Sequence, residues 1–305
     1  MKRELPQRVF IVGCGATGKR LAALWGQKGA TVTALARSPE SEKQLQALGI
    51  GTVPGDLDKP ESLAWLGHDG ATLAQALCYY LVPPPFQSEG EEDSRMQTFL
   101  RAIPKGKEPS KLVYMSTTGV YGDLKGGSAT EETPLHPLNA RSQRRISAEN
   151  AIKEWSQERG IPFVILRAGG IYGIAERLPL DRISNKEPTV REEEAPWVSM
   201  IHIDDLAELS FLAGRNSAAD CQVYNCVAPK SSLRMCEFYN LVAEAMGLEK
   251  PPTITMEEAR KTLTTMMMSF LVESRVVVAD KVVGELGYEF RYPDVRSGLQ
   301  PISAS

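Results

Sequence analysis

Three glycines near the start of the chain have a spacing that can hold phosphate groups. Gly13, Gly15 and Gly18 form a Gly-x-Gly-x-x-Gly motif, which follows the apolar run 9–12 and opens a helical pattern. The first glycine allows a tight turn, the second lets the backbone approach a pyrophosphate, and the third lets helix and strand pack closely. An ordinary glycine turn is the alternative, but the flanking strand and helix favour a dinucleotide site. The expected contacts are Gly13, Gly15, Ala16, Thr17 and Gly18.

The residues after the next β-rich run bear on which nicotinamide cofactor would bind. Residues 31–36 form that run, and Arg37 and Ser38 follow it directly. An NAD-selective site usually has Asp or Glu there to bind the ribose hydroxyls, whereas a cation and a hydroxyl suit a 2′-phosphate. The sequence therefore favours NADP(H) over NAD(H), with Arg37 and Ser38 as contacts. A solvated arginine at a strand end is the alternative.

The overall composition is typical of a globular protein and argues against several kinds of partner. The 305 residues carry a net charge of −3 with acidic and basic residues interspersed, which disfavours nucleic acid and anionic membranes as partners. No apolar stretch is long enough to span a bilayer, and the first strand begins too early to leave room for a signal peptide. We therefore expect a cytoplasmic protein.

Cysteine and histidine are too scattered to indicate a disulfide framework or a metal site. The chain has five cysteines, an odd number without Cys-x-x-Cys spacing, which is typical of reduced thiols. The three histidines, His68, His136 and His202, are far apart in the sequence. We therefore expect no metal.

Apolar runs alternate with helical patterns through the first half of the chain, and these elements must position the groups above. Most of the runs are continuous, as in strands that are buried on both faces. The alternation predicts an α/β fold, a Rossmann-type doubly wound parallel sheet. The predicted strands are residues 9–12, 31–36, 51–54, 77–82, 111–116 and 162–166.

The alternation fades beyond residue 228, which predicts a smaller C-terminal substrate lobe. We expect residues 1–173 to form the dinucleotide-binding Rossmann domain, with a later segment near 201–228 returning to it. Residues 174–200 and 229–305 would then form the lobe.

Five segments of the chain form a recognisable series of motifs. Two of them are residues 114–122, Tyr-Met-Ser-Thr-Thr-Gly-Val-Tyr-Gly, and residues 201–207, Ile-His-Ile-Asp-Asp-Leu-Ala; the other three are residues 55–58, 166–173 and 223–225. In this order they resemble the extended short-chain dehydrogenase/reductases, the NAD-dependent epimerase/dehydratase family, with residues 114–122 similar to its active-site strand and residues 201–207 to a family signature. The resemblance implies an adenine contact from Asp56 and Leu57, and further cofactor contacts from Pro83, Arg145 and Ile171.

The resemblance also implies a function and a substrate class. It indicates an NAD(P)-binding, epimerase/dehydratase-like oxidoreductase that acts on a small molecule, for which a nucleotide sugar is one candidate. It leaves a homodimer open.

The chain departs from the family at its Tyr-x-x-x-Lys pair. The register set by residues 145–149 puts Arg141 in the tyrosine position and Arg145 in the lysine position. A guanidinium does not lose its proton in proteins, so Arg141 cannot serve as general acid/base. Arg145 can still bond the nicotinamide ribose, and Thr117 aligns with the catalytic Ser/Thr, so these two are the catalytic candidates. This departure resembles the atypical bacterial YeeZ type, whose members also lack the tyrosine.

Other proton carriers near these motifs are expected to be structural. They are Tyr121, Ser142, Tyr172 and Cys78, and none has support beyond proximity. For His202 we expect a hydrogen-bonded structural role, with Asp204 or Asp205 capping the next helix. Two functions stay open: an oxidoreductase with a non-standard active site, and a non-catalytic dinucleotide-binding redox sensor or regulatory protein.

Overall fold

The computed structural model describes residues 5–67, 72–85 and 90–299. His68 and residues 300–305 of the expected C-terminal lobe lie outside the described residues. The chain divides into two compact units. The first unit comprises residues 1–117, 140–167 and 207–224, and the second unit comprises residues 118–139, 168–206 and 225–305.

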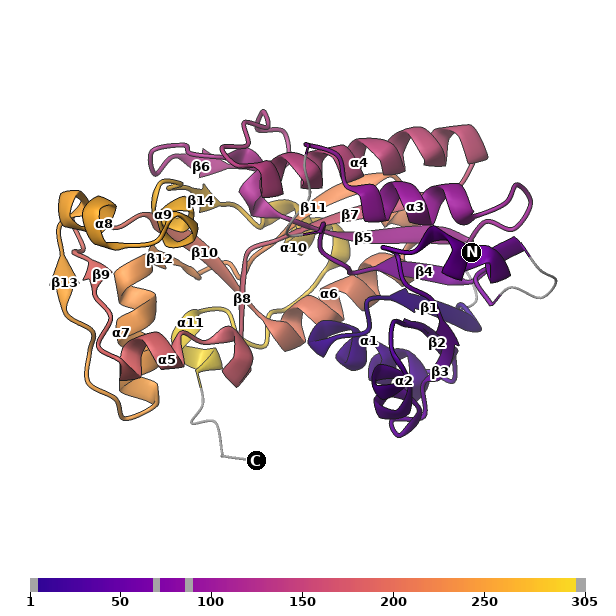
Figure 1. The fold of residues 1–305 in the computed structure, drawn as a ribbon, viewed down its shortest axis with the longest axis horizontal. Helices are drawn as coiled ribbons and strands as arrows, with labels where there is room; N and C mark the ends of the chain where they lie inside the picture. The colour runs from indigo at the N-terminus through magenta and orange to yellow at the C-terminus, as the bar shows by residue number, and fades with distance from the viewer. Residues whose placement is uncertain (1–4, 68–71, 86–89, 300–305) are drawn as a thin grey trace. The chain divides into compact units, whose positions relative to one another are not determined.

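A seven-stranded sheet forms the centre of the fold, in the order β11-β7-β5-β4-β1-β2-β3 (Figure 1). β1 pairs in parallel with β2 and β4, β2 with β3, and β4 with β5. The strands are β1 (Arg8–Val12), β2 (Thr31–Ala36), β3 (Gly51–Pro54), β4 (Leu77–Tyr80), β5 (Lys111–Thr117), β7 (Phe163–Ala168) and β11 (Gln222–Cys226). The chain moves outward from β1 in one direction and then in the other, so the predicted doubly wound Rossmann-type fold is confirmed.

Helices cover both faces of this sheet, with α3 and α4 on one face and α1 and α6 on the other (Figure 1). The helices and short 3₁₀ segments that accompany the sheet are α1 (Ala16–Gln27), α2 (Pro39–Gln46), η1 (Pro60–Gly67), α3 (Ser94–Ala102), α4 (Ala140–Arg159), α6 (Ile203–Arg215) and η4 (Ser217–Ala219). α1 buries Leu21, Ala22 and Trp25 along one stripe, as its apolar spacing requires. Trp25 packs on Phe211 of α6 with ring centroids 4.5 Å apart.

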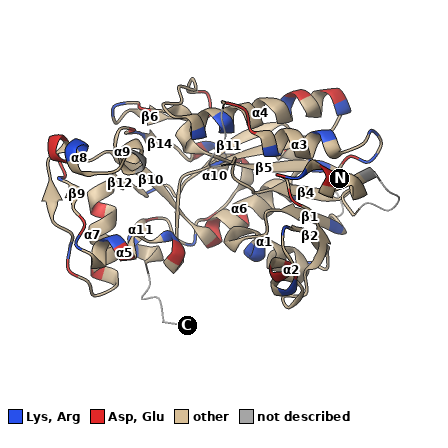
Figure 2. Ribbon diagram, in the orientation of Figure 1, with Lys and Arg blue, Asp and Glu red and all other residues tan. Residues whose placement is uncertain are grey.

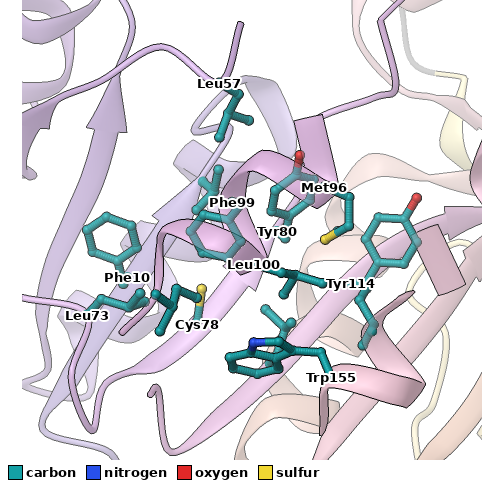
Figure 3. Close-up of a cluster of buried hydrophobic side chains, with 14 of the residues drawn as sticks. Phe10, Leu57, Leu73, Cys78, Tyr80, Met96, Phe99, Leu100, Tyr114 and Trp155 are labelled. Atoms are coloured by element: carbon teal, nitrogen blue, oxygen red, sulfur yellow. The ribbon is translucent and has the colours of Figure 1, made fainter. Parts of the chain in front are cut away.

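The core between the sheet and the α3–α4 layer is rich in aromatic side chains (Figure 3). Phe10, Tyr80 and Tyr114 come from three strands, and Phe99 and Trp155 come from α3 and α4. Tyr80 and Tyr114 are register partners on neighbouring strands, and their ring centroids are 6.0 Å apart. This core packs α3 and α4 against β4 and β5.

The second unit contains small sheets and short helices around a core of its own. β10 (Trp197–His202) lies between β8 (Gly170–Tyr172) and β12 (Ser232–Arg234). The remaining strands are β6 (Ser128–Ala129), β9 (Thr189–Val190), β13 (Thr253–Ile254) and β14 (Val276–Val277). The helical elements are η2 (Thr118–Tyr121), η3 (Ala175–Arg177), α5 (Leu180–Ser184), α7 (Met235–Ala245), α8 (Met256–Thr262), α9 (Thr265–Leu271), α10 (Asp280–Leu286) and α11 (Val295–Gly298). Tyr172, Met200, Phe238 and Val242 belong to the core of this unit.

Within the described part of the chain, no helix is both long and apolar enough to cross a membrane. The five cysteines are free thiols, and only Cys221 is exposed.

Candidate functional site

The glycine turn between β1 and α1 has no room for side chains at two of its positions. Gly13 has φ +91°, and a Cβ there would lie 2.7 Å from Cγ2 of Val82. A Cβ at Gly18 would lie 3.0 Å from the carbonyl oxygen of Gly13. The tight turn and the close approach of α1 to β1 therefore require glycine at these two positions.

The third glycine, Gly15, faces open space instead. It is the N-cap of α1 and provides no side-chain cap, and a Cβ added to it would meet nothing within 4 Å. The first N–H groups of α1 thus lack a side-chain cap, and a ligand can approach the backbone closely. Ala16 and Thr17 form the first turn of the helix and are half-buried. This uncapped helix start fits the pyrophosphate of a dinucleotide.

Arg37 and Ser38 lie at the carboxyl end of β2, where they join α2. Arg37 is exposed, while the hydroxyl of Ser38 accepts a hydrogen bond of 3.2 Å from the backbone N–H of Ser41. Ser38 is therefore the N-cap of α2, in a capping box with Ser41. The sequence interpretation did not include this cap, although the Ser-Pro pair at the start of a helical pattern is a local signal for it.

The turn after β3 is connected to the segment after β4 by an arginine that the sequence interpretation missed. Arg95 forms two hydrogen bonds to the carboxylate of Asp58, of 2.7 and 2.6 Å, and donates a third, of 3.2 Å, to the carbonyl oxygen of Pro83. These contacts hold the pKa of Asp58 below its usual value, with a smaller contribution from Arg37. Asp56 accepts a 3.0 Å bond from the N–H of Asp58, and Leu57 packs into the core. Asp58 and Arg95 are 37 positions apart in the sequence, so no local pattern revealed the pair.

The first two turns of α4 carry three arginines, which Figure 2 shows as a basic start to this helix. Arg141 is exposed, and Arg144 donates a 3.0 Å hydrogen bond to the carbonyl oxygen of Gly90. Arg145 is only 8% exposed, and its Nη1 donates to the carbonyl oxygen of Met115 at 2.6 Å. Cations are unfavourable at the positive end of a helix, so these arginines do not stabilise α4. Their positive charge and N–H groups are better suited to binding an anionic or polyhydroxylated ligand.

The next inward-facing position of α4 fixes the register of the helix. Glu149 is fully buried, forms an ion pair with Arg167 at 2.7 Å, and accepts a 2.6 Å hydrogen bond from the hydroxyl of Ser116. Because residues four apart share a helix face, Arg145 must lie against β5 when Glu149 does. Thr117 is the last residue of β5, at the carboxyl edge of the sheet, and is half-buried.

The parallel strands bring most of the expected site residues to one edge of the sheet. β1, β2, β3 and β5 end next to the glycine turn, Arg37, Asp56 and Thr117 respectively, and the carboxyl ends of parallel strands meet at the same edge. Ile171 differs from the rest, because it lies on β8 in the second unit, where it pairs with Ile201.

The other candidate proton carriers are buried, and the two tyrosines among them donate hydrogen bonds to protein groups. Tyr121 donates a 2.6 Å hydrogen bond to the side chain of Asn225, and Tyr172 donates a 3.1 Å bond to the carbonyl oxygen of Asp294. Burial raises the pKa values of Tyr172 and Cys78 far above their usual ranges, and Ser142 is buried as well. These environments support the structural interpretation of all four residues.

His202 is packed between two aromatic rings in the second unit. Its ring lies 5.3 Å from that of Tyr172 and 3.8 Å from that of Tyr292, and its Nδ1 accepts a hydrogen bond from the N–H of Asp204. The expected cap from Asp204 or Asp205 is wrong, because α6 begins at Ile203 and both residues lie in its first turn. The buried carboxylate of Asp205 accepts bonds from the hydroxyl of Tyr288 and from two backbone N–H groups of residues 291–292.

The sequence matches one family model and, over a short segment, a known relative. Residues 9–226 match the model of the NAD dependent epimerase/dehydratase family. A segment of 66 residues is 38% identical to an uncharacterized UDP-glucose epimerase, YtcB, of Bacillus subtilis, and it covers 22% of this chain and 21% of that relative.

Solved structures of similar fold can be superposed on nearly the whole length of this chain. A conserved protein of unknown function from Silicibacter pomeroyi has a TM-score of 0.74 at 24% identity, with 96% of this chain and 97% of that chain covered. The UDP-glucuronic acid 4-epimerase of Bacillus cereus, in complex with UDP-glucuronic acid and NAD, has a TM-score of 0.73 at 18% identity, with 96% of each chain covered.

Proposed function

Because the chain belongs to the NAD-dependent epimerase/dehydratase family, we propose that it binds a nicotinamide dinucleotide at the carboxyl edge of its seven-stranded sheet. The observation that carries this proposal is the glycine turn. Gly13 and Gly18 bring the strand and helix together, and Gly15 leaves the start of α1 open. Asp56 and Leu57 would contact the adenine, and Pro83, which follows β4, would line the cofactor.

We further propose that NADP(H) is the preferred cofactor. Arg37 is exposed at the end of β2, and α2 begins directly beside it with Ser38 as its N-cap and Glu40 and Glu42 in its first turn. A 2′-phosphate there would gain an ion pair with Arg37 and hydrogen bonds from the helix start and Ser38. No carboxylate follows β2 directly to bind free ribose hydroxyls.

We assign the nicotinamide half to Arg145 and Thr117. Nη1 of the Arg145 guanidinium is held by β5 and Nε is buried, so Nη2 is the nitrogen that would bond the ribose hydroxyls. The Thr117 hydroxyl would hydrogen-bond a substrate oxygen. When bound, the dinucleotide supplies hydride chemistry, and the protein supplies orientation and a positive field from α4.

The proposed activity is oxidoreductase chemistry on a small molecule without the tyrosine acid/base. A nucleotide sugar is the proposed substrate class, and the complex of the similar Bacillus cereus epimerase with UDP-glucuronic acid supports it. A second candidate is dinucleotide binding without turnover, as in a redox sensor. It is favoured by the exposed Arg141 at the tyrosine position and by the buried, bonded hydroxyls of Tyr121 and Tyr172.

Titration calorimetry with NADPH and NADH tests the binding proposal. Gly15→Leu should abolish binding of both, because its side chain would occupy the space of the pyrophosphate. Gly26→Leu is the matched control, since Gly26 also lies in α1 and a Cβ there meets nothing within 4 Å. Equal affinities for Gly15→Leu and wild type would remove the glycine turn from the site.

A further inference from the structure

Four polar residues form a buried cluster between β4, β5, α3 and α4 of the first unit. Tyr80 and Tyr114 are fully buried, Asp93 is 1% exposed and Arg145 is 8% exposed. Figure 3 shows the two tyrosines side by side, with their hydroxyl groups pointing to the same side of the cluster. Asp93 caps α3 by accepting a 3.1 Å bond from the N–H of Met96.

Of the two tyrosines, Tyr114 is the one that bonds Arg145. Its hydroxyl accepts a 3.2 Å hydrogen bond from Nη1, the nitrogen that also donates to the carbonyl oxygen of Met115 at 2.6 Å. Nη1 carries two hydrogens, so these two bonds use both of them. The Tyr80 hydroxyl and Nε of Arg145 have no hydrogen-bond partner among the described residues.

We propose that Tyr114 is a positioning residue that orients Arg145 toward the nicotinamide ribose. With Nη1 held by Tyr114 and Met115 and Nε buried, the rigid guanidinium fork would present Nη2 to the ligand. The inference rests on the proposed dinucleotide function. In this chain Arg141 occupies the family's tyrosine position on α4. The inference therefore gives the role of the hydroxyl beside the cation Arg145 to Tyr114, which lies on β5.

Orientation matters because arginine is long and has many rotamers. Holding one rotamer before binding removes part of the ordering entropy that the complex would otherwise lose. Burial raises the pKa of Tyr114 to about 12, although Arg145 opposes the shift, so the hydroxyl keeps its proton near neutral pH. Tyr114 therefore acts as a neutral hydrogen-bond partner of Arg145 rather than as an acid or base.

The test compares Tyr114→Phe with Tyr80→Phe. Both changes remove one buried hydroxyl from neighbouring strands of the same core, but only the first removes a bond to Arg145. The ligands are the dinucleotide, NADPH or NADH, that wild type binds more tightly, and ADP, which lacks the nicotinamide ribose. We expect Tyr114→Phe to weaken the dinucleotide about tenfold, as for loss of a bond to a charged group, with ADP within about twofold of wild type. Tyr80→Phe should leave both affinities within about twofold.

A double-mutant cycle shows whether Tyr114 acts through Arg145. Tyr114→Phe should add nothing to Arg145→Gln, because the second change has already removed the group that Tyr114 holds. If Tyr114→Phe does not fold, Tyr114→Met replaces it in the test. Methionine also fills an apolar core without a hydroxyl, so the same selective loss is expected.

The outcomes separate this inference from the proposed function. If wild type binds ADP and dinucleotide but Tyr114→Phe binds both as wild type does, the positioning role is wrong and dinucleotide binding stands. Equal losses for ADP and dinucleotide, or equal losses in the two Phe variants, would indicate a packing effect and also overturn it. If wild type binds no dinucleotide, the proposed function itself fails.

Discussion

At the scale of single residues, Arg37 carries the proposed choice between the two cofactors. It is exposed at the end of β2, close enough to Asp58 to help lower the pKa of that carboxyl. A cation in this position discriminates only if it meets a group that one cofactor has and the other lacks. The 2′-phosphate is that group.

Arg37→Ala should therefore weaken NADPH binding by roughly tenfold, as for loss of one charge-assisted contact, and leave NADH nearly unchanged. Calorimetric titration of both cofactors measures the ratio. Lys43→Ala is the control, because it removes an exposed cation from the last turn of the neighbouring helix α2. Parallel losses for NADPH and NADH would place Arg37 away from the 2′-phosphate.

At the scale of elements, α4 is oriented by what its buried face contacts. Glu149 is held by Arg167 and Ser116, and Arg145 by Met115 and Tyr114. All four partners lie on β5 or β7, so the helix cannot rotate without breaking several charged bonds. This is why a helix whose first turns carry three cations keeps Arg145 turned inward.

The neighbouring helix α3 is capped by the buried carboxyl of Asp93, and the shift of its pKa predicts how stability changes with pH. Burial raises the pKa of Asp93, although the bonds from Met96 and the charges of Arg145 and Arg95 oppose the shift. A carboxyl with a raised folded-state pKa contributes most stability below its unfolded value, and that contribution is lost as pH rises through the folded value.

Asp93→Asn removes this titration and keeps a good helix cap. The variant should thus be more stable than wild type at pH 7, and the difference should shrink as pH falls toward the ordinary carboxyl value of 3.8. Urea unfolding at a series of pH values measures it. Asp93→Ala loses the cap and should be about 1 kcal/mol less stable than Asp93→Asn at each pH. A stability difference that grows toward acid would contradict the assigned sign.

At the scale of the whole molecule, binding and turnover are expected to separate. The proposed phosphate and adenine contacts lie on the glycine turn and the turn after β3, whereas the missing tyrosine would belong to α4. Loss of a general acid/base typically lowers the rate by about 10²–10⁴-fold. Cofactor binding does not depend on that group.

Wild type should therefore bind the dinucleotide with little hydride transfer to common nucleotide sugars. Absorbance of the reduced nicotinamide measures the transfer, and calorimetry on the same sample measures binding. Fast hydride transfer with a single essential base in the pH profile would mean that another residue replaces the tyrosine. Alanine changes at Tyr121, Ser142 and Tyr172 would then identify it, and a loss at any of them would contradict its structural interpretation.

The sequence alone determined the fold class and the place of the glycine turn. Strand–helix alternation, continuous apolar runs and the spacing of Gly13, Gly15 and Gly18 are local properties, and local periodicity decides element type and order. The six predicted strands coincide with six of the seven strands of the sheet, apart from shifts of one or two residues at their ends, and β11 was not among them. The resemblance of residues 145–149 to the family's Lys-x-x-x-Glu pattern likewise suggested the register of α4 before any contact was known.

Only the tertiary structure decided which side chains meet. Arg95 with Asp58, Glu149 with Arg167, and Arg145 with Tyr114 join residues that are 18 to 37 positions apart. Each pairing depends on strand order and on how a helix packs over the sheet, and these follow from burial of the whole core rather than from any short segment. The sequence could therefore show that the tyrosine position on α4 is occupied by Arg141, but not that a buried tyrosine on β5 bonds the arginine one turn later.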